Sequence, residues 1–120
     1  MATIKNYTDI NQSKKLAEIL PLESADMLFQ LGENKYADSI RVPLTKEHWE
    51  QMIPAINPCW SLAALLGVLP DIHLKKYIYD GITKYYTTLV GIKQFNSEHY
   101  DNPIDACVAM IEKLNELNLL

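Results

Sequence analysis

Residues 75–90 read KKYIYDGITKYYTTLV, a stretch rich in tyrosine, threonine and branched side chains that favour β-strands. The Asp80-Gly81 dipeptide near its middle suits the left-handed backbone conformations of a tight turn. The stretch therefore predicts an antiparallel hairpin of about residues 75–79 with 82–90. Because adjacent residues point to opposite faces of a strand, the paired tyrosines in KYY indicate a sheet that is partly covered on both sides.

A helix follows this hairpin. Residues 101–111 read DNPIDACVAMI, in which Asn102 is a helix cap, Pro103 takes the first helical position and Asp105 the third. Apolar side chains then recur along one face, namely Ile104, Cys107, Val108, Ile111 and Leu114. The pattern predicts the last helix over about residues 103–117.

Caps and prolines indicate two more helices before the hairpin. Thr45 caps a segment whose apolar residues share one side, Trp49, Met52 and Ile53, and which ends at Pro54. Ser61 caps the segment SLAALLGVL, in which leucines recur at the spacing of one helix face until Pro70. Two short helices are therefore expected between residues 45 and 70.

The amino-terminal third carries weaker signals. Either Asp9 or Ser13 can cap a short helix with a narrow apolar face, and Pro21 stops it. Apolar clusters at residues 27–29 and 40–42 flank a turn-prone Gly-Glu-Asn triplet and predict two strands.

These elements define the fold class. A further short strand is expected over residues 95–100, just before the last helix. The chain is thus predicted to be α+β, with a small antiparallel sheet packed with short helices. Its 120 residues, of which 48% are hydrophobic, fit a single globular domain over residues 1–120.

Composition argues against several classes of function. The net charge is -4, and Arg41 is the one arginine among eleven basic residues, so no nucleic-acid partner is expected. The tyrosines of the hairpin are expected to pack in the sheet rather than to stack on bases; they are Tyr77, Tyr79, Tyr85 and Tyr86. No apolar run resembles a signal peptide or a membrane span, so we expect a cytoplasmic protein without a membrane partner.

Histidines and cysteines give no metal or cofactor motif. His48, His73 and His99 are isolated in the sequence from one another and from the cysteines, and the glycines are scattered singly. We therefore expect no metal and no cofactor. Cys59 and Cys107 form no Cys-x-x-Cys pair and are expected to be reduced, buried thiols.

One set of residues is compatible with catalysis. Cys59 precedes a predicted helix start, an environment that activates thiols, and His99 and Asn102 follow it in the chain. This order, and the Cys59-Trp60 dipeptide, resemble papain-like hydrolases. The resemblance implies a cysteine hydrolase or transferase that uses Cys59 with His99 or His73. Because Cys59 lacks a glycine-rich flank and Asn102 serves as a cap, the preferred interpretation is a buried structural thiol, with no catalytic residue assigned.

Two strings carry a second resemblance. PCWSLAALLGVLP at residues 58–70 and DNPIDACVAMI at residues 101–111 look like those of small uncharacterised proteins of gut bacteria and of their phages or mobile elements. The layout of a sheet followed by an Asn-Pro-x-Asp-Ala helix is also similar to small phage sandwich domains, with helices on both sides of an antiparallel sheet. Both resemblances imply an accessory protein and bring no activity or catalytic residue set.

The expected function is therefore contact with another protein rather than catalysis. Caps and apolar faces explain nearly every residue that could carry chemistry. Because a domain of this size has a limited core, self-association as a homodimer is the alternative to an unknown protein partner.

Overall fold

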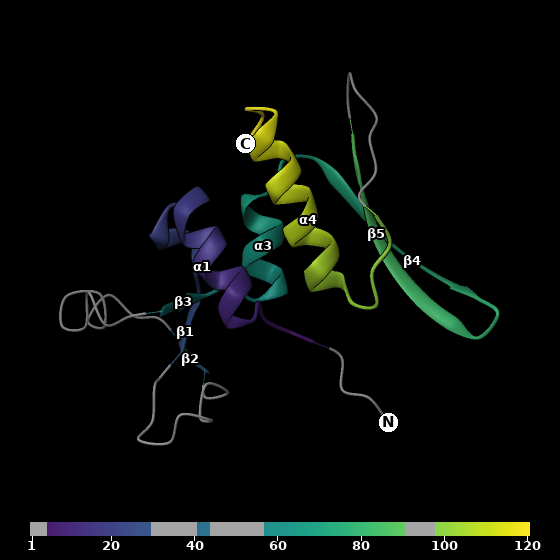
Figure 1. Ribbon diagram of the computed structural model, residues 1–120, viewed down its shortest axis with the longest axis horizontal. Coiled ribbons are helices and arrows are strands. Elements are labelled where there is room, and N and C mark those ends of the chain that lie inside the picture. The colour runs from purple at the N-terminus through teal and green to yellow at the C-terminus, as the bar shows by residue number, and fades with distance from the viewer. Residues whose placement is uncertain (1–4, 30–40, 44–56, 91–97) are drawn as a thin grey trace. The chain divides into compact units, whose positions relative to one another are not determined.

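The structure is a computed structural model that describes residues 5–29, 41–43, 57–90 and 98–120 (Figure 1). In chain order the elements are α1 (Ile10–Ile19), a short 3-10 helix (Leu22–Ser24), β1 (Met27–Phe29), β2 (Arg41–Pro43), β3 (Asn57–Cys59), α3 (Leu62–Val68), β4 (Ile72–Tyr79), β5 (Ile82–Leu89) and α4 (Pro103–Glu116). Helices combine with antiparallel strands, so the predicted α+β class is confirmed.

The chain divides into two compact units. The amino-terminal unit is Tyr7–Ala64, and the carboxy-terminal unit is Leu65–Leu120 together with Lys5 and Asn6. The boundary falls within α3, and the single-domain organisation stays a prediction.

The amino-terminal unit contains a three-stranded antiparallel sheet in the order β2-β1-β3, and α1 packs against β3. Leu28 of β1 is opposite Val42 on one side and Pro58 on the other. The two strands predicted in this region are confirmed. The third strand, β3, is a correction, because the sequence pattern indicates only a connection before Cys59.

Capping residues set the helix starts in this unit. The side chain of Asp9 accepts from the backbone N–H of Gln12 at 2.8 Å, and Gln12 Oε1 accepts from the Asp9 N–H at 3.1 Å. This reciprocal pair is a capping box. Ser13 lies inside α1 and is buried, so the alternative cap at Ser13 is wrong.

The predicted cap at Ser61 is confirmed. Its hydroxyl oxygen accepts from the backbone N–H of Ala64 at 3.2 Å, three residues into the turn. Asp26 holds the cap from the end of the 3-10 region, because its carboxylate accepts from both the backbone N–H and the hydroxyl of Ser61. The helix predicted after Thr45, with Trp49, Met52 and Ile53, lies outside the described residues, as does His48.

The carboxy-terminal unit contains the β4–β5 hairpin and α4, which packs mainly against β5 (Figure 1). Asp80 and Gly81 have φ values of 52° and 78°, which confirms the predicted tight turn. β4 begins at Ile72, three residues before the predicted start. The last helix has the predicted cap at Asn102, and Asp105 lies in its first turn.

Part of the strand predicted over residues 95–100 is described. Tyr100 forms an antiparallel bridge with Tyr85, with backbone hydrogen bonds of 2.7 and 2.8 Å. Residues 91–97 lie outside the described part of the chain. The bridge places the segment before α4 against the edge of β5.

The described helices are short. None of them combines the length and the apolar character that a membrane span needs.

Candidate functional site

The β4–β5 hairpin has one face that packs against α4. Thr87 of β5 is fully buried on this face, and its hydroxyl donates to the backbone carbonyl of Ala106 at 3.3 Å. The register places Leu74 opposite Thr87, and Leu74 is half-buried. This contact holds the end of the hairpin that is farthest from the turn against α4.

The outer face of the hairpin, which points away from α4, combines basic and aromatic residues. The register pairs Lys75 with Tyr86 and Tyr77 with Lys84. Because alternate residues share a face and these pairs are two residues apart, all four side chains lie on the outer face. The Lys75 Nζ lies 5.9 Å from the centre of the Tyr86 ring, a cation–π arrangement.

His99 closes this cluster from the segment before α4. Its ring stacks on Tyr86 with centroids 4.6 Å apart and planes at 10°, and its Nδ1 lies 2.6 Å from the Tyr77 hydroxyl oxygen. Lys84 is paired with Asp101 of the same segment at 2.5 Å. The tyrosine faces are thus partly used by neighbouring side chains, as the sequence predicts for Tyr77 and Tyr86.

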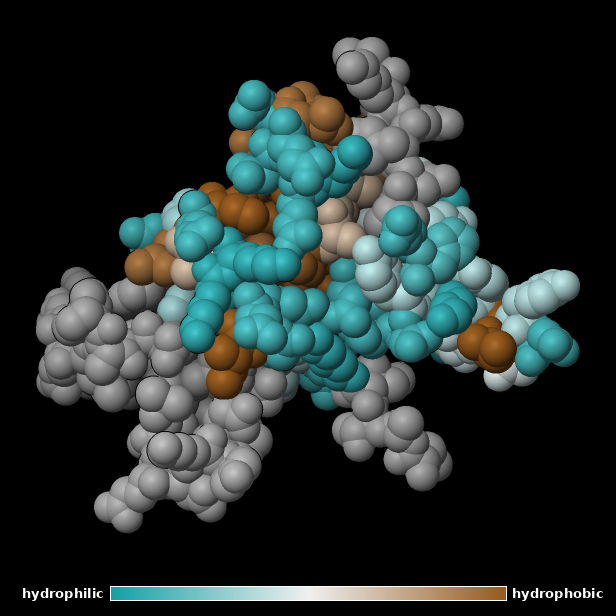
Figure 2. Space-filling model, viewed as in Figure 1, coloured by the Kyte–Doolittle hydropathy of each residue, from teal (hydrophilic) through white to brown (hydrophobic). Residues whose placement is uncertain are grey.

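The turn end of the hairpin exposes large apolar side chains. Ile78 is 67% exposed, Tyr79 76% and Ile82 57%. Tyr79 and Ile82 are opposite each other on the outer face, whereas Ile78 points to the face that α4 covers farther along the hairpin. Apolar surface is therefore present on both faces of the hairpin end. This end projects beyond α4 (Figure 1), and Figure 2 shows an apolar patch there on the side in view.

The charge of the hairpin differs from that of the whole chain. β4 and β5 together contain three lysines, Lys75, Lys76 and Lys84, and no acidic residue, whereas the chain has a net charge of -4. Within the described residues, Lys84 is in an ion pair, and neither Lys75 nor Lys76 is. The two strands of the hairpin are therefore basic, and Asp80 in the turn is the one acidic residue between Ile72 and Leu89.

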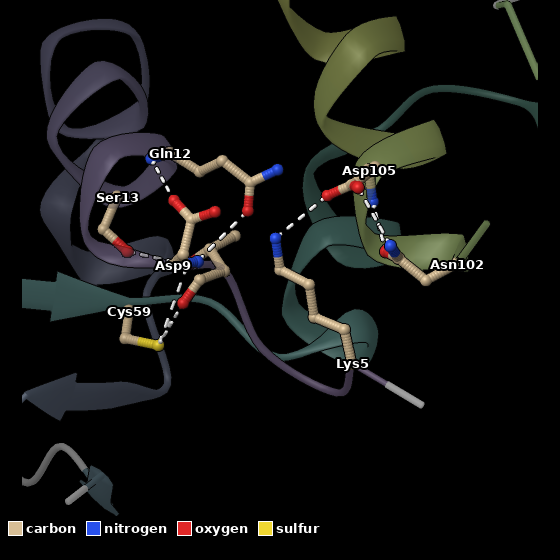
Figure 3. A network of polar contacts seen from close by, with 8 residues as sticks. Lys5, Asp9, Gln12, Ser13, Cys59, Asn102 and Asp105 are labelled. Carbon is tan, nitrogen blue, oxygen red and sulfur yellow. Dashed lines mark hydrogen bonds and ion pairs between the residues drawn. The ribbon is translucent and has the colours of Figure 1, made fainter. Parts of the chain in front are cut away.

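Cys59 lies in a buried polar cluster of the amino-terminal unit (Figure 3). Its thiol donates to the backbone carbonyl of Thr8 at 3.4 Å, and the Thr8 hydroxyl donates to the sulfur at 3.7 Å. Thr8 Oγ1 also accepts from the Trp60 backbone N–H at 3.1 Å and lies 2.8 Å from Ser13 Oγ. Cys59, Thr8 and Trp60 are fully buried. In this arrangement the thiol is a hydrogen-bond donor to the backbone.

The residues of the hydrolase hypothesis have other roles in the structure. Asn102 caps α4, and His99 is stacked on Tyr86. His73 is exposed on β4 opposite Thr88. A nucleophilic cysteine needs access to substrate, whereas Cys59 has no exposed surface. The pairing of Cys59 with His99 or His73 stays a prediction.

The second cysteine is also buried. Desolvation raises the pKa of the Cys107 thiol from its ordinary value of 9.0 to about 12. Burial also raises the pKa of Tyr100, and the negative charges of Glu98, Asp105 and Glu112 act in the same direction. Within the described ranges, no group of three or more His, Cys, Asp or Glu side chains is arranged to hold a metal ion.

A groove of about 410 Å³ lies along α1 in the amino-terminal unit, lined by Ile10, Ser13, Lys14, Ala17, Glu18, Leu22 and Pro58. Its buried polar residue, Ser13, is already hydrogen-bonded to Thr8, and its charged residues, Lys14 and Glu18, are solvent-exposed. The groove therefore shows no buried reactive group.

Sequence reasoning missed the basic side of the hairpin. The hairpin was predicted without a register, so the lysines could not be assigned to the same face as the tyrosines. The alternation of Lys75 with Tyr77 in β4, and of Lys84 with Tyr86 in β5, is the signal that could have shown it. Comparison of the chain with protein-family models, with curated proteins and with solved structures found no match.

Proposed function

We propose that the protein acts by contact with another protein and that the turn end of the β4–β5 hairpin is the contact surface. The observation that carries the proposal is the joint exposure of Ile78, Tyr79 and Ile82 at one projecting end. Scattered apolar residues are ordinary on protein surfaces, but adjacent ones at the end of a two-stranded projection are typical of interaction sites.

Energetics support this assignment. Burial of a fully exposed large apolar side chain stabilises by about 1.5–3 kcal/mol. The three side chains are between 57% and 76% exposed, so most of that contribution is still available to a partner. On the outer face Tyr79 is opposite Ile82, and tyrosine is among the residues enriched at interface hot spots.

The wider role rests on the sequence. The resemblance carried by the strings PCWSLAALLGVLP and DNPIDACVAMI supports an accessory protein of a phage or mobile element, and the cytoplasm stays the expected location. A second copy of the chain is the alternative to a different protein partner. The proposal does not depend on this choice, because both partners would bury the same hairpin end.

Native mass spectrometry of the protein purified gently from its own host tests the proposal. One variant carries Ile78→Ser, Tyr79→Ser and Ile82→Ser. The matched control carries Leu66→Ser, Val90→Ser and Leu119→Ser, which remove exposed apolar side chains elsewhere in the same unit. We expect the wild type and the control to carry an additional mass, either a second copy or another protein, and the hairpin-end variant to lose it. A bare monomer for the wild type, or equal loss in both variants, would contradict the proposal.

A further inference from the structure

The edge of β4 that faces away from β5 is a backbone surface beside the proposed contact surface. Within the described residues, β4 pairs with β5 on one side and with no other strand. β5, by contrast, is bridged on its second edge by Tyr100. An eight-residue strand whose second edge is unpaired among the described residues presents a row of backbone N–H and C=O groups to which another strand can pair.

The side chains along this edge favour one class of partner. Lys75 and Lys76 are adjacent in the middle of β4, so one points to each face of the sheet. Neither lysine is in an ion pair within the described part of the chain. Opposite charges directly across two strands are favourable, and like charges are unfavourable.

The same lysines argue against a second copy at this edge. If two β4 strands paired antiparallel about their centres, Lys75 and Lys76 of one copy would face those of the other. Lysines on an edge strand are a common protection against such self-pairing. An acidic strand paired with this edge would bring no repulsion between like charges.

We infer that the β4 edge binds an extended, acidic polypeptide segment by strand addition, with two adjacent carboxylates opposite Lys75 and Lys76. This inference rests on the proposed protein-contact function and names the chemistry of the partner. Backbone hydrogen bonds to β4 hold the segment, and the carboxylates fix its position along the strand. Apolar residues farther along the segment cover Ile78 and Tyr79, which lie at the turn end of the same strand.

Defined peptides test the inference. The probe is an eight-residue peptide of valine and threonine with two adjacent glutamates at its centre, and the control peptide has two lysines there. We expect saturable binding of the probe by fluorescence anisotropy, with backbone amide shifts along β4 in the NMR spectrum. Two favourable cross-strand pairs in place of two unfavourable ones predict at least about a fourfold difference in affinity between the peptides.

Two further variants separate strand addition from simple charge attraction. Lys75→Glu with Lys76→Glu reverses the preference, so that this variant binds the lysine peptide more tightly. N-methylation of alternate amides on the pairing edge of the glutamate peptide abolishes binding, because it removes the donors while it keeps the charge. Circular dichroism verifies that the double variant is folded.

Several results would overturn the inference. They are no saturable binding of the glutamate peptide, equal affinity for both peptides, binding that survives N-methylation, and tighter binding of an oligothymidine of similar length. If the peptide fails to bind while the hairpin-end serine variant still loses its partner in native mass spectrometry, strand addition is wrong and the contact function stands. If the hairpin-end variant keeps its partner, the contact function itself is wrong.

Discussion

The side chain of Asn102 contacts Asp105 twice at the start of α4: its Oδ1 accepts from the Asp105 backbone N–H at 2.8 Å, and its Nδ2 donates to the Asp105 carboxylate at 2.9 Å (Figure 3). Lys5 adds a third contact, because its Nζ lies 3.0 Å from the same carboxylate. Asn102 and Asp105 are half-buried, and Ala106 and Cys107, which follow them in α4, are fully buried. The helix that supports the hairpin is therefore anchored at its first turn.

Removal of this cap gives the first prediction. Asn102→Ala loses both contacts to Asp105 and leaves a helix N–H without its acceptor, so the free energy of unfolding is expected to fall by about 1 kcal/mol. Asn102→Ser keeps a capping oxygen, so its free energy of unfolding should fall clearly less than that of Asn102→Ala. Urea unfolding of the three proteins measures the difference. Equal stability of the alanine and serine variants would show that the cap has no energetic role.

The buried hydroxyl of Thr8 gives the second prediction. Thr8→Val keeps the shape of the side chain but leaves the Trp60 backbone N–H and the Ser13 hydroxyl without Thr8 Oγ1. An unsatisfied buried group costs about 1–3 kcal/mol, so we expect a loss of about 2 kcal/mol or more. Thr8→Ser keeps the hydroxyl and loses one methyl group, at a cost of about 1 kcal/mol. The reverse order of the two variants in urea unfolding would contradict this network.

The third prediction concerns pH. The folded-state pKa of Cys107, about 12, exceeds the ordinary value of 9.0, so the unfolded thiol releases its proton at lower pH than the folded one. The stability of the protein is therefore expected to fall as the pH rises from about 9 to about 12, by at most about 1.4 kcal/mol per pH unit from this group. Below that range the thiol is protonated in both states and adds no pH dependence.

A comparison of variants isolates this thiol, because Tyr100 also has a raised pKa and acts in the same direction. Urea unfolding of the wild type and of Cys107→Ala over the alkaline range should show a steeper loss in the wild type. Parallel curves would mean that the thiol is not desolvated in the folded protein.

The fourth prediction tests the cysteine hydrolase alternative. Because Cys59 and Cys107 are both fully buried, iodoacetamide near neutral pH should modify neither in the folded protein and both after unfolding. Mass spectrometry of the modified peptides identifies each site. Rapid modification of Cys59 in the folded protein, faster than in the unfolded control, would instead support catalysis with His99 or His73.

Local signals predicted much of the fold. Asp9, Ser61 and Asn102 are caps in the structure, and Asp80-Gly81 is the hairpin turn. Each of these features depends on a few consecutive residues, since capping and turn formation need only local hydrogen bonds and backbone angles. The last helix was predicted well for the same reason.

Features that depend on distant residues were not predicted. The three-residue strand β3 contains Pro58, which has no backbone N–H and reads as a turn residue, and only its pairing with β1 makes it a strand. The contact of Thr8 with Cys59 joins residues 51 positions apart and has no sequence signal. In the candidate site, the position of Lys75 and Lys84 on the same face as the tyrosines became visible only with the register of β4 and β5.

Site-specific photocrosslinking tests the central claim, contact through the hairpin end, most directly. Photoreactive benzoylphenylalanine replaces Tyr79 in one variant and the exposed Leu66, in the same unit, in a matched control. After illumination in cells of the natural host, we expect a crosslinked product of higher mass from position 79 and much less from position 66. No crosslink from position 79, or equal crosslinking from both positions, would contradict the assignment of the hairpin end as the contact surface.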